Sequence, residues 1–282
     1  MKISEALVRA NKILNEAVVG SARLDAVIFM TQILSCSKEK IIFNPDLELG
    51  AAQQDEFFEL VARRAKRVPT SQIIGKREFF GEDFFVNGDV LDPRPDSESL
   101  IEFVTENFPD KKRKLKILEV GVGSGCLIVT LARLYEMADG IGVDISEKAL
   151  DVCKKNAQLH QVSERLKLLR SDLFAQVVGE KFDLVISNPP YIATAEIEDL
   201  EPEVRLYEPR TALDGGIDGL DFYRRIAAEV RDFLKENGTI ILEIGRDQQE
   251  EIIEIFSAKK FQLTASKLDL SGVVRVLCFK NL

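Results

Sequence analysis

The chain has 282 residues, of which 45% are hydrophobic and 30% charged, and its formal net charge is −9. This composition is typical of a globular protein with one large or two ordinary domains, and neither disorder nor a membrane class is needed to explain it. No apolar run approaches the roughly 18 residues of a transmembrane helix, and we find no signal peptide, so we expect a cytoplasmic protein without membrane contact. The acidic balance argues against direct nucleic-acid binding, which normally needs a basic surface.

Few residues suited to metal binding or base catalysis are present. The four cysteines are scattered without a C-x-x-C pair, and His160 is the only histidine. Zinc sites and disulfide frameworks need closely spaced ligands or paired cysteines, so we predict free thiols and no metal site. One histidine also argues against a catalytic triad.

The first 75 residues are predicted to form a small helical bundle. Apolar residues recur at helical spacing over 3–14 and again over 24–34, and a third helix is predicted to begin near Gly50. Short helices joined by short links favour a bundle.

The pattern changes after residue 75. Aromatic residues alternate around turn signals from 78 to 91, which predicts a β-hairpin, and Asn87-Gly88 is a turn or bulge signal within it. Asp96 and Ser97 are predicted to cap the helix that follows. We interpret the hairpin as a connector between two domains. The predicted organisation is a helical domain at 1–75, a hairpin connector at 76–95 and an α/β domain at 96–282.

From residue 115 onward, predicted strands alternate with predicted helices. This alternation is typical of a parallel sheet with helices on both faces. The last two strands follow each other without a helix, which predicts an antiparallel hairpin at the sheet edge. The predicted strands are 116–120, 140–144, 167–169, 183–187, 239–244, 261–267 and 273–279. The predicted helices are 98–108, 125–135, 147–160, 219–234 and 248–256.

A glycine-rich loop lies between the first strand of this domain and the next helix. Its sequence is Glu119-Val120-Gly121-Val122-Gly123-Ser124-Gly125, and glycines permit a tight turn and close approach of the backbone to a ligand. A dinucleotide fingerprint requires G-x-G-x-x-G, whereas here the third glycine comes one residue early and an acidic residue stands two before the first glycine. This spacing favours S-adenosylmethionine over NAD, and a purely structural glycine turn is the alternative.

The next two strand ends carry further candidate ligands. Asp144 follows the glycine loop by about twenty residues, where a carboxylate can accept both hydroxyls of a ribose. Asp172 is predicted to contact the amino group of an adenine, and Leu173 to cover its ring. A helix cap is the alternative role for Asp144, and a loop cap for Asp172.

Asn188-Pro189-Pro190-Tyr191 directly follows the fourth strand. Two prolines lack the N–H groups that would extend the sheet, so they fix a rigid loop at the carboxyl end of the strand, where open α/β sheets bind ligands. The asparagine brings an acceptor and two donors and the tyrosine a flat ring, a set that can hold a planar amide or amidine nitrogen. A proline-rich turn with an Asx cap is the alternative.

These residues suit methyl transfer from a sulfonium. Such a methyl group is already electrophilic, so the protein mainly has to position a nucleophile. Hydrogen bonds from both N–H groups of an amide, to the Asn188 side-chain oxygen and the Pro189 backbone carbonyl, would polarise its nitrogen. Tyr191 is predicted to stack against the planar group. No histidine base is needed, because the nitrogen becomes acidic only as the methyl arrives.

Several segments together resemble one family. Ile74-Gly75-Lys76-Arg77-Glu78-Phe79-Phe80-Gly81, Pro93-Arg94-Pro95-Asp96-Ser97-Glu98, Glu208-Pro209-Arg210-Thr211-Ala212-Leu213 and the stretch 215–224 are similar to the HemK/PrmC family, the N5-glutamine methyltransferases of peptide chain release factors. The resemblance spans nearly the whole chain. The chain departs from the family pattern at Ser71-Gln72, at Asp92 and at Asp96-Ser97, where the family has P-R-P-E-T-E.

The resemblance implies a class I S-adenosylmethionine-dependent methyltransferase. Its fold is Rossmann-like, with a mostly parallel seven-stranded sheet and an antiparallel edge hairpin, preceded by a helical domain that helps to dock the release factor. Asn188, Pro189, Pro190 and Tyr191 would hold the glutamine of the Gly-Gly-Gln motif in a monomeric enzyme. The residues that would bind the cofactor by matching position are Gly121, Val122, Gly123, Ser124, Gly125, Asp144, Leu173 and Asn188.

Two other functions stay open at this point. N6-adenine methyltransferases of DNA or RNA share the Asn-Pro-Pro-Tyr tetrapeptide, although the acidic charge and the lack of an obvious nucleic-acid motif count against that activity. A non-enzymatic binding module that retains the fold is the second alternative, and the intact glycine loop and tetrapeptide argue against it.

Overall fold

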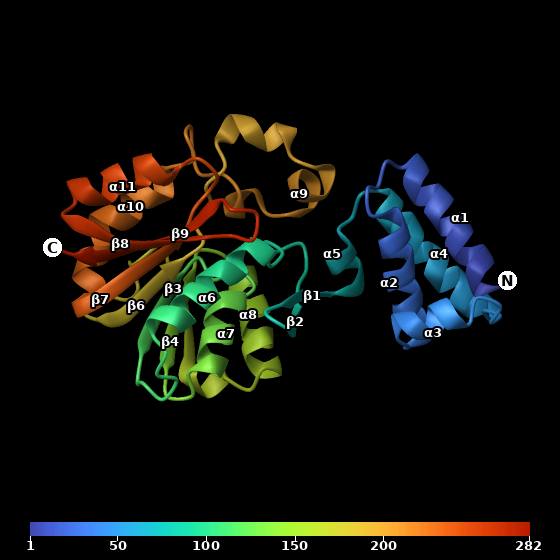
Figure 1. Ribbon diagram of the computed structural model, residues 1–282, viewed down its shortest axis with the longest axis horizontal. Helices are drawn as coiled ribbons and strands as arrows, with labels where there is room; N and C mark the ends of the chain where they lie inside the picture. Colours follow the sequence, from blue (N-terminus) through green and yellow to red (C-terminus); the bar gives the residue numbers. More distant parts are fainter. The chain divides into compact units, whose positions relative to one another are not determined.

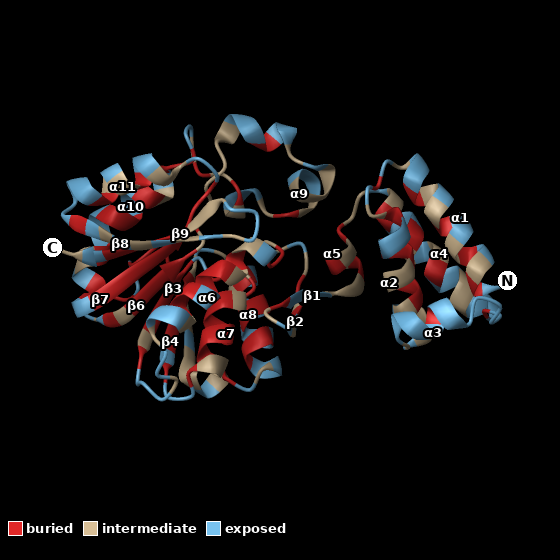
Figure 2. Cartoon of the chain, viewed as in Figure 1, coloured by how far each residue is buried: buried red, intermediate tan, exposed pale blue.

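The computed structural model describes residues 1–282 as two compact units. Met1–Lys76 and Glu201–Tyr207 form the helical unit, and Arg77–Leu200 and Glu208–Leu282 form the α/β unit. Each has its own hydrophobic core, and its buried residues are red in Figure 2, in the same view as Figure 1. None of the helices combines the length and the apolar character that a membrane crossing requires.

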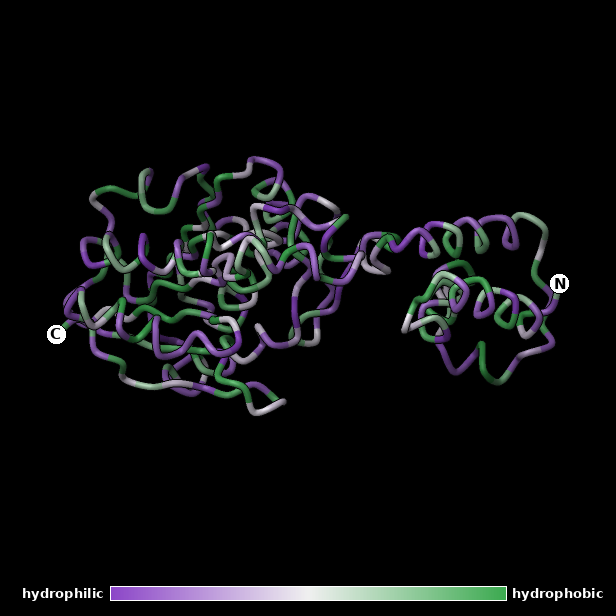
Figure 3. Tube along the Cα trace, turned by 90° about the horizontal axis from the view of Figure 1, so that it is seen from above, coloured by the Kyte–Doolittle hydropathy of each residue, from purple (hydrophilic) through white to green (hydrophobic).

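The helices of the helical unit bury apolar residues in a common core. In α1, Ala6, Ala10 and Leu14 recur at intervals of four and are fully buried, and the exposed residues of the helix are polar except for Val8. Hydrophilic and hydrophobic segments alternate along the helices in Figure 3. The predicted bundle is confirmed, with two further short helices, α3 and α5. The helices are α1 Ile3–Glu16, α2 Ala22–Leu34, α3 Lys38–Phe43, α4 Ala51–Ala65 and α5 Thr70–Ile74.

A short helix from much later in the chain, α9 Pro202–Tyr207, completes the helical unit. Buried Arg64 binds Asp25 through Nε and Glu203 through Nη1, each at 2.8 Å. Tyr207 donates its hydroxyl to the carbonyl of Lys66 at 2.7 Å. A buried cation that holds two carboxylates is costly to disrupt, because removing Arg64 leaves buried Asp25 without a cation, whereas Glu203 still binds Arg67. The segment 201–207 is therefore firmly bound to α2 and α4.

The predicted hairpin consists of β1 Lys76–Phe79 and β2 Glu82–Phe85. Its two loop residues, Phe80 and Gly81, have φ angles of 51° and 77°, which is the conformation that twisted two-residue hairpin loops require. Asn87-Gly88 lies in a separate turn after β2, where the Asn87 side chain accepts the N–H of Asp89 at 3.0 Å.

The predicted cap of the next helix is wrong. A 3₁₀ turn, Pro95–Ser97, runs directly into α6 Glu98–Asn107, so Ser97 has helical dihedral angles and makes no side-chain cap. Asp96 is bound to Arg275 at 3.0 Å instead. The Ser97 hydroxyl is thereby free for a contact elsewhere, which is described below.

The α/β unit contains the predicted seven-stranded, mostly parallel sheet. The strand order is β5-β4-β3-β6-β7-β9-β8, with β3 to β7 parallel and β9 antiparallel to both of its neighbours. The strands are β3 Lys116–Val120, β4 Asp139–Asp144, β5 Leu166–Arg170, β6 Phe182–Ser187, β7 Leu234–Glu243, β8 Phe261–Leu268 and β9 Val274–Asn281.

Helices cover both faces of this sheet (Figure 1). α6, α7 Cys126–Leu134 and α8 Glu147–Leu159 pack on one face, and α10 Asp221–Glu229 and α11 Gln249–Ala258 on the other. The strand ends differ from prediction mainly at β7, which begins at Leu234 and not at 239. The residues at 235–237 are exposed and polar, so this part of the strand has no apolar signal.

The order of the strands creates a crevice at one sheet edge. From β3 the chain moves outward to β4 and β5, and then returns to place β6 on the opposite side of β3. The loops that leave the carboxyl ends of β3 and β6 therefore diverge, and such a switch point is where open α/β sheets bind ligands.

Candidate active site

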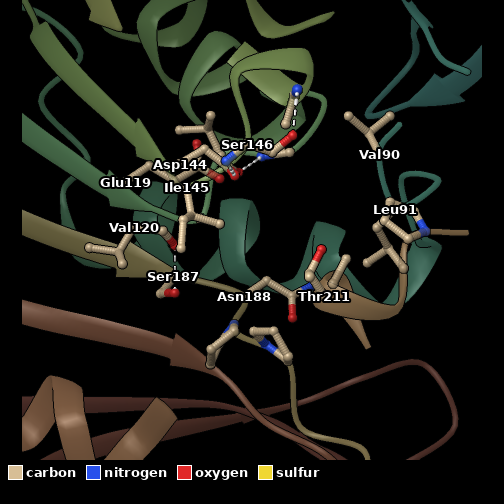
Figure 4. Close-up of a pocket in the computed structure, with 18 of the residues that line it drawn as sticks. Val90, Leu91, Glu119, Val120, Asp144, Ile145, Ser146, Ser187, Asn188 and Thr211 are labelled. Carbon is tan, nitrogen blue, oxygen red and sulfur yellow. Dashed lines mark hydrogen bonds between the residues drawn. The ribbon is translucent and has the colours of Figure 1, made fainter. Parts of the chain in front are cut away.

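A cavity of about 540 Å³ lies at the carboxyl ends of β3 to β6. In Figure 4, Glu119 and Asp144 lie on one side of it, Asn188 beside Ser187 at the end of β6, and Leu91 on a further wall. The lining includes the predicted site residues Glu119, Gly121, Val122, Gly123, Ser124, Asp144, Asp172, Leu173, Asn188, Pro189 and Pro190. Gly125 and Tyr191 do not line it.

Gly125 and Glu119 fix the glycine loop to the structure around it. Gly125 has a φ of +79°, and a Cβ there would lie 2.4 Å from the Sγ of Cys153, so α7 and α8 pack more closely than a side chain would allow. The Glu119 carboxylate is 2% exposed and accepts the N–H of Ile128 at 2.9 Å, in the first turn of α7. Burial raises the pKa of Glu119. Its contact to a helix amino terminus favours the ionised form.

Asp144 connects the end of β4 to the glycine loop. One carboxylate oxygen accepts the N–H of Gly123 at 3.0 Å and the other accepts the N–H of Ser146 at 2.9 Å. Burial raises the pKa of Asp144, and these backbone donors oppose the rise. Because a carboxylate oxygen accepts more than one hydrogen bond, both oxygens can still accept from a ligand in the cavity.

The end of β5 holds Leu173 in an unusual conformation. Leu173 has a φ of 45°, in the left-handed region, and its carbonyl accepts the Ser171 hydroxyl at 2.8 Å. Such strain in a non-glycine residue is typical of functional sites. Asp172, next to it, binds Arg225 at 2.7 Å and is half exposed.

Asn188 begins the loop Asn188–Tyr191, here called the Asn188 loop. Its amide nitrogen donates to the Ser97 hydroxyl at 3.2 Å, which leaves its carbonyl oxygen as an acceptor. Ser187, the last residue of β6, donates its hydroxyl to the carbonyl of Val120 at 2.7 Å. The Asn188 loop is thus tied to the start of the glycine loop on one side and to the turn before α6 on the other.

The segment after the Asn188 loop supports it from behind. Ile192 forms a parallel bridge with Asp214, and the Gln248 side chain donates to the carbonyl of Tyr191 at 2.9 Å. A Cβ on Gly215 would lie 2.8 Å from the carbonyl oxygen of Pro190. The backbone of residues 213–219 therefore packs directly on the backbone of the Asn188 loop.

Tyr191 lies on the core side of the loop. Its ring packs against the hydrophobic cluster beneath α10 and α11, and burial raises the pKa of Tyr191 to about 12. The predicted stacking of this ring against a bound planar group is not supported by this placement. The sequence shows that a tyrosine follows the prolines, but not to which side its ring turns.

Comparison with known proteins gives the family of the chain. Residues 5–75 match the model of the PrmC N-terminal domain, and residues 95–203 match that of the methyltransferase small domain. The chain is 36% identical to the release factor glutamine methyltransferase of Agrobacterium fabrum, over 99% of this chain and 97% of that protein. A protein of the same name from Geobacter sulfurreducens is 39% identical over 94% of this chain and 91% of its own length. The chain belongs to the release factor glutamine methyltransferase family.

Family membership confirms the resemblance that the sequence segments indicated. The α/β unit has the fold of a class I S-adenosylmethionine-dependent methyltransferase. A methyltransferase of Pyrococcus furiosus has a similar fold, with a TM-score of 0.55 at 18% identity, over 78% of this chain and 99% of that one.

Two of the segments that carry the family resemblance meet at the cavity wall. Arg94 donates through Nη2 to both carboxylate oxygens of Glu208, at 2.8 and 2.6 Å. Burial raises the pKa of Glu208 to about 7, and Arg94 opposes the rise. The sequence patterns assign neither Arg94 nor Glu208 to a site. Their positions in P-R-P and E-P-R segments, both short and charged, are the signal that would have drawn attention to them.

Proposed function

We propose that this protein transfers a methyl group from S-adenosylmethionine to the side-chain amide nitrogen N5 of the glutamine in the Gly-Gly-Gln motif of peptide chain release factors. The observation that carries the proposal is the place of Asn188, whose acceptor oxygen shares one cavity with the glycine loop and Asp144. The relatives that are 36% and 39% identical carry the name of this activity.

The cavity fits the cofactor in size and in chemistry. Its volume of about 540 Å³ lies within the range of small-molecule sites, and it offers a carboxylate and apolar groups at successive strand ends. The cofactor supplies a methyl group on a positively charged sulfur, which is electrophilic without further activation. The residues that would hold it are Glu119, Gly121, Val122, Gly123, Ser124, Asp144, Asp172, Leu173 and Asn188, while Gly125 lets the glycine loop enter α7.

The Asn188 loop would hold the glutamine amide. The Asn188 side-chain oxygen and the Pro189 backbone carbonyl each accept one N–H, which concentrates electron density on the nitrogen and stabilises charge as it develops there. Pro190 keeps the loop rigid. Tyr191 serves as the anchor of the loop in the core. No general base is required, in agreement with the single histidine at position 160.

The protein partner fits the charge of the chain better than a nucleic acid does. A formal net charge of −9 disfavours a direct contact to a phosphate backbone. We infer that the helical unit helps to dock the release factor and that the enzyme acts as a monomer.

The test is to locate the methyl group. Purified protein is incubated with labelled S-adenosylmethionine and either a release factor, a release factor with the motif glutamine replaced by alanine, or DNA and RNA. We expect label only in the unaltered release factor, with mass spectrometry of a digest placing it on the motif glutamine. Label in nucleic acid alone would support adenine methylation instead. Cofactor binding without any transfer would support a binding module.

Asp144→Ala is expected to weaken cofactor binding by about 10- to 100-fold, because hydrogen bonds to a charged group contribute about 1.5–3 kcal/mol each. Isothermal titration calorimetry measures this effect directly. Asp144→Asn keeps an acceptor for the N–H of Gly123 and separates the loss of charge from a disturbance of the loop. Asp151→Ala, at an exposed position of α8, is the matched control with unchanged affinity. An unchanged dissociation constant in Asp144→Ala would remove this residue from the cofactor site.

A further inference from the structure

Glu243, the last residue of β7, is a buried carboxyl group that the proposed function does not use. It is 1% exposed, and neither of its carboxylate oxygens makes a hydrogen bond of full geometry within the protein. Burying an acid in this way is unfavourable, so stability alone does not account for it. Its neighbour Leu242 pairs with Ser187, directly before Asn188, so Glu243 lies behind the Asn188 loop.

The pKa of the Glu243 carboxyl is affected by two neutral side chains, Ser97 and Asn188, and by several charged or titratable groups. Burial raises the pKa of Glu243 to about 7, while the Ser97 hydroxyl, the Arg275 guanidinium and the Asn188 amide oppose the rise. Arg275 is already bound to carboxylates at 2.9 and 3.0 Å, so Ser97 and Asn188 remain as close partners. The charged or titratable groups that face Glu243 are Asp96, Cys126, Tyr191, Tyr223 and Arg275.

Ser97 stands between Glu243 and Asn188. The Asn188 amide nitrogen donates to the Ser97 oxygen at 3.2 Å, so the hydroxyl is the acceptor in that contact. A hydroxyl has one proton to donate. Ser97 and Asn188 both lower the pKa of Glu243, so both polar groups lie next to its carboxyl. The three side chains thus lie together behind the Asn188 loop, and this set, from Asn188 through Ser97 to Glu243, is here called the relay.

The direction of this relay decides which end of the Asn188 amide faces the cavity. A hydroxyl by itself can accept from the amide nitrogen or donate to the amide oxygen, so Ser97 alone does not distinguish the two orientations. An ionised carboxylate only accepts. With its proton toward Glu243, the Ser97 hydroxyl presents a lone pair to Asn188, and only the amide nitrogen fits there, which is the orientation observed. The amide oxygen is then left for the cavity.

We propose that Glu243 is a positioning residue, whose carboxylate sets the direction of the Ser97 hydroxyl and thereby holds the Asn188 oxygen toward the substrate amide. This inference rests on the proposed function, in which that oxygen accepts an N–H of the glutamine. A protonated Glu243 would donate to Ser97 and reverse the relay. Because its pKa is raised to about 7, the competent ionised form predominates above about pH 7 and is lost as the pH falls.

The relay is tested by a double-mutant cycle, in which the kcat values of the wild type, two single variants and the double variant are compared. Glu243→Met and Ser97→Ala are each expected to lower kcat about tenfold, the equivalent of one hydrogen bond, with unchanged affinity for the cofactor. The double variant should be no slower than the slower single variant, since both changes cut the same relay. Glu243→Gln keeps an acceptor of the same shape, so its kcat should be much closer to that of the wild type than the kcat of Glu243→Met. Because glutamine does not titrate, the loss of kcat below about pH 7 should be absent in this variant.

Two further measurements do not depend on turnover. The unfolding midpoint of Glu243→Met should be unchanged or higher, because an apolar side chain replaces a buried acid. The NMR signals of the Asn188 side-chain amide, assigned by their absence in Asn188→Ala, should shift with pH around 7 in the wild type and not in Glu243→Gln. Thr130→Val, which removes another buried hydroxyl without a partner in α7, is the control with unchanged kcat.

The outcomes separate the inference from the proposed function. Additive losses in the cycle, wild-type kcat in Glu243→Met, or an amide signal that does not respond to pH would overturn the positioning role. If the wild-type protein places no methyl on glutamine, the proposed function fails, and the NMR titration still decides whether Glu243 controls the Asn188 amide.

Discussion

Asn188→Ala is expected to lower the rate of glutamine methylation by about 10²- to 10³-fold, the usual effect of removing one positioned hydrogen-bonding group from a transition state. The side chain is only half buried and makes a single protein hydrogen bond, to Ser97. The free energy of unfolding should therefore change by no more than about 1 kcal/mol. Single-turnover kinetics with a release factor, together with denaturant unfolding, measure both quantities.

A matched control and a second variant sharpen this result. Asn237→Ala removes an exposed asparagine of β7 and should leave both the rate and the stability unchanged. Asn188→Asp keeps an acceptor but cannot donate to Ser97, and it places a second acid near Glu243, so it should also be slow. Wild-type turnover by Asn188→Ala would exclude this residue from the mechanism.

The residues at the strand ends were predictable because their position follows from topology. Asp144 ends a predicted strand, Asn188 directly follows one and Asp172 lies three residues after one, and the carboxyl ends of parallel strands meet at one edge of the sheet. Each residue could therefore be assigned to the cavity from local sequence alone. Their order along the chain differs from their order across the sheet, because β5, which precedes Asp172, lies outside β4, which ends in Asp144.

Contacts that depend on distant segments were not predictable in this way. Ser97 was predicted to cap α6, but its hydroxyl meets Asn188, which lies 91 residues later. Glu203 lies in a helix that packs with Arg64 in the helical unit. Glu243 ends the apolar part of β7, where its neighbours are set by the pairing of β7 with β6 and β9. Periodicity shows which residues are buried, but it does not show which buried polar groups meet.

Gly219→Ala is expected to reduce both stability and rate, because the backbone at this position touches the Asn188 loop. Gly219 has a φ of +76°, and a Cβ there would lie 2.3 Å from the carbonyl oxygen of Tyr191 and 2.7 Å from the side-chain nitrogen of Gln248. Those two atoms are themselves hydrogen bonded at 2.9 Å. The left-handed conformation costs an alanine about 1–2 kcal/mol, and the overpacked contact adds about 1–3 kcal/mol.

Gly272→Ala is a control that separates the cost of the left-handed conformation from the cost of the overpacked contact. Gly272 has a φ of +79° in the turn between β8 and β9, and a Cβ there would meet nothing within 4 Å. It should lose only the conformational part, about 1–2 kcal/mol, with an unchanged kcat. Gly219→Ala should lose more stability than this control, and its kcat should fall at least about tenfold because the carbonyl of Tyr191 must move and displace the Asn188 loop. Equal stability losses and equal rates in the two variants would show that the segment 213–219 does not set the geometry of the Asn188 loop.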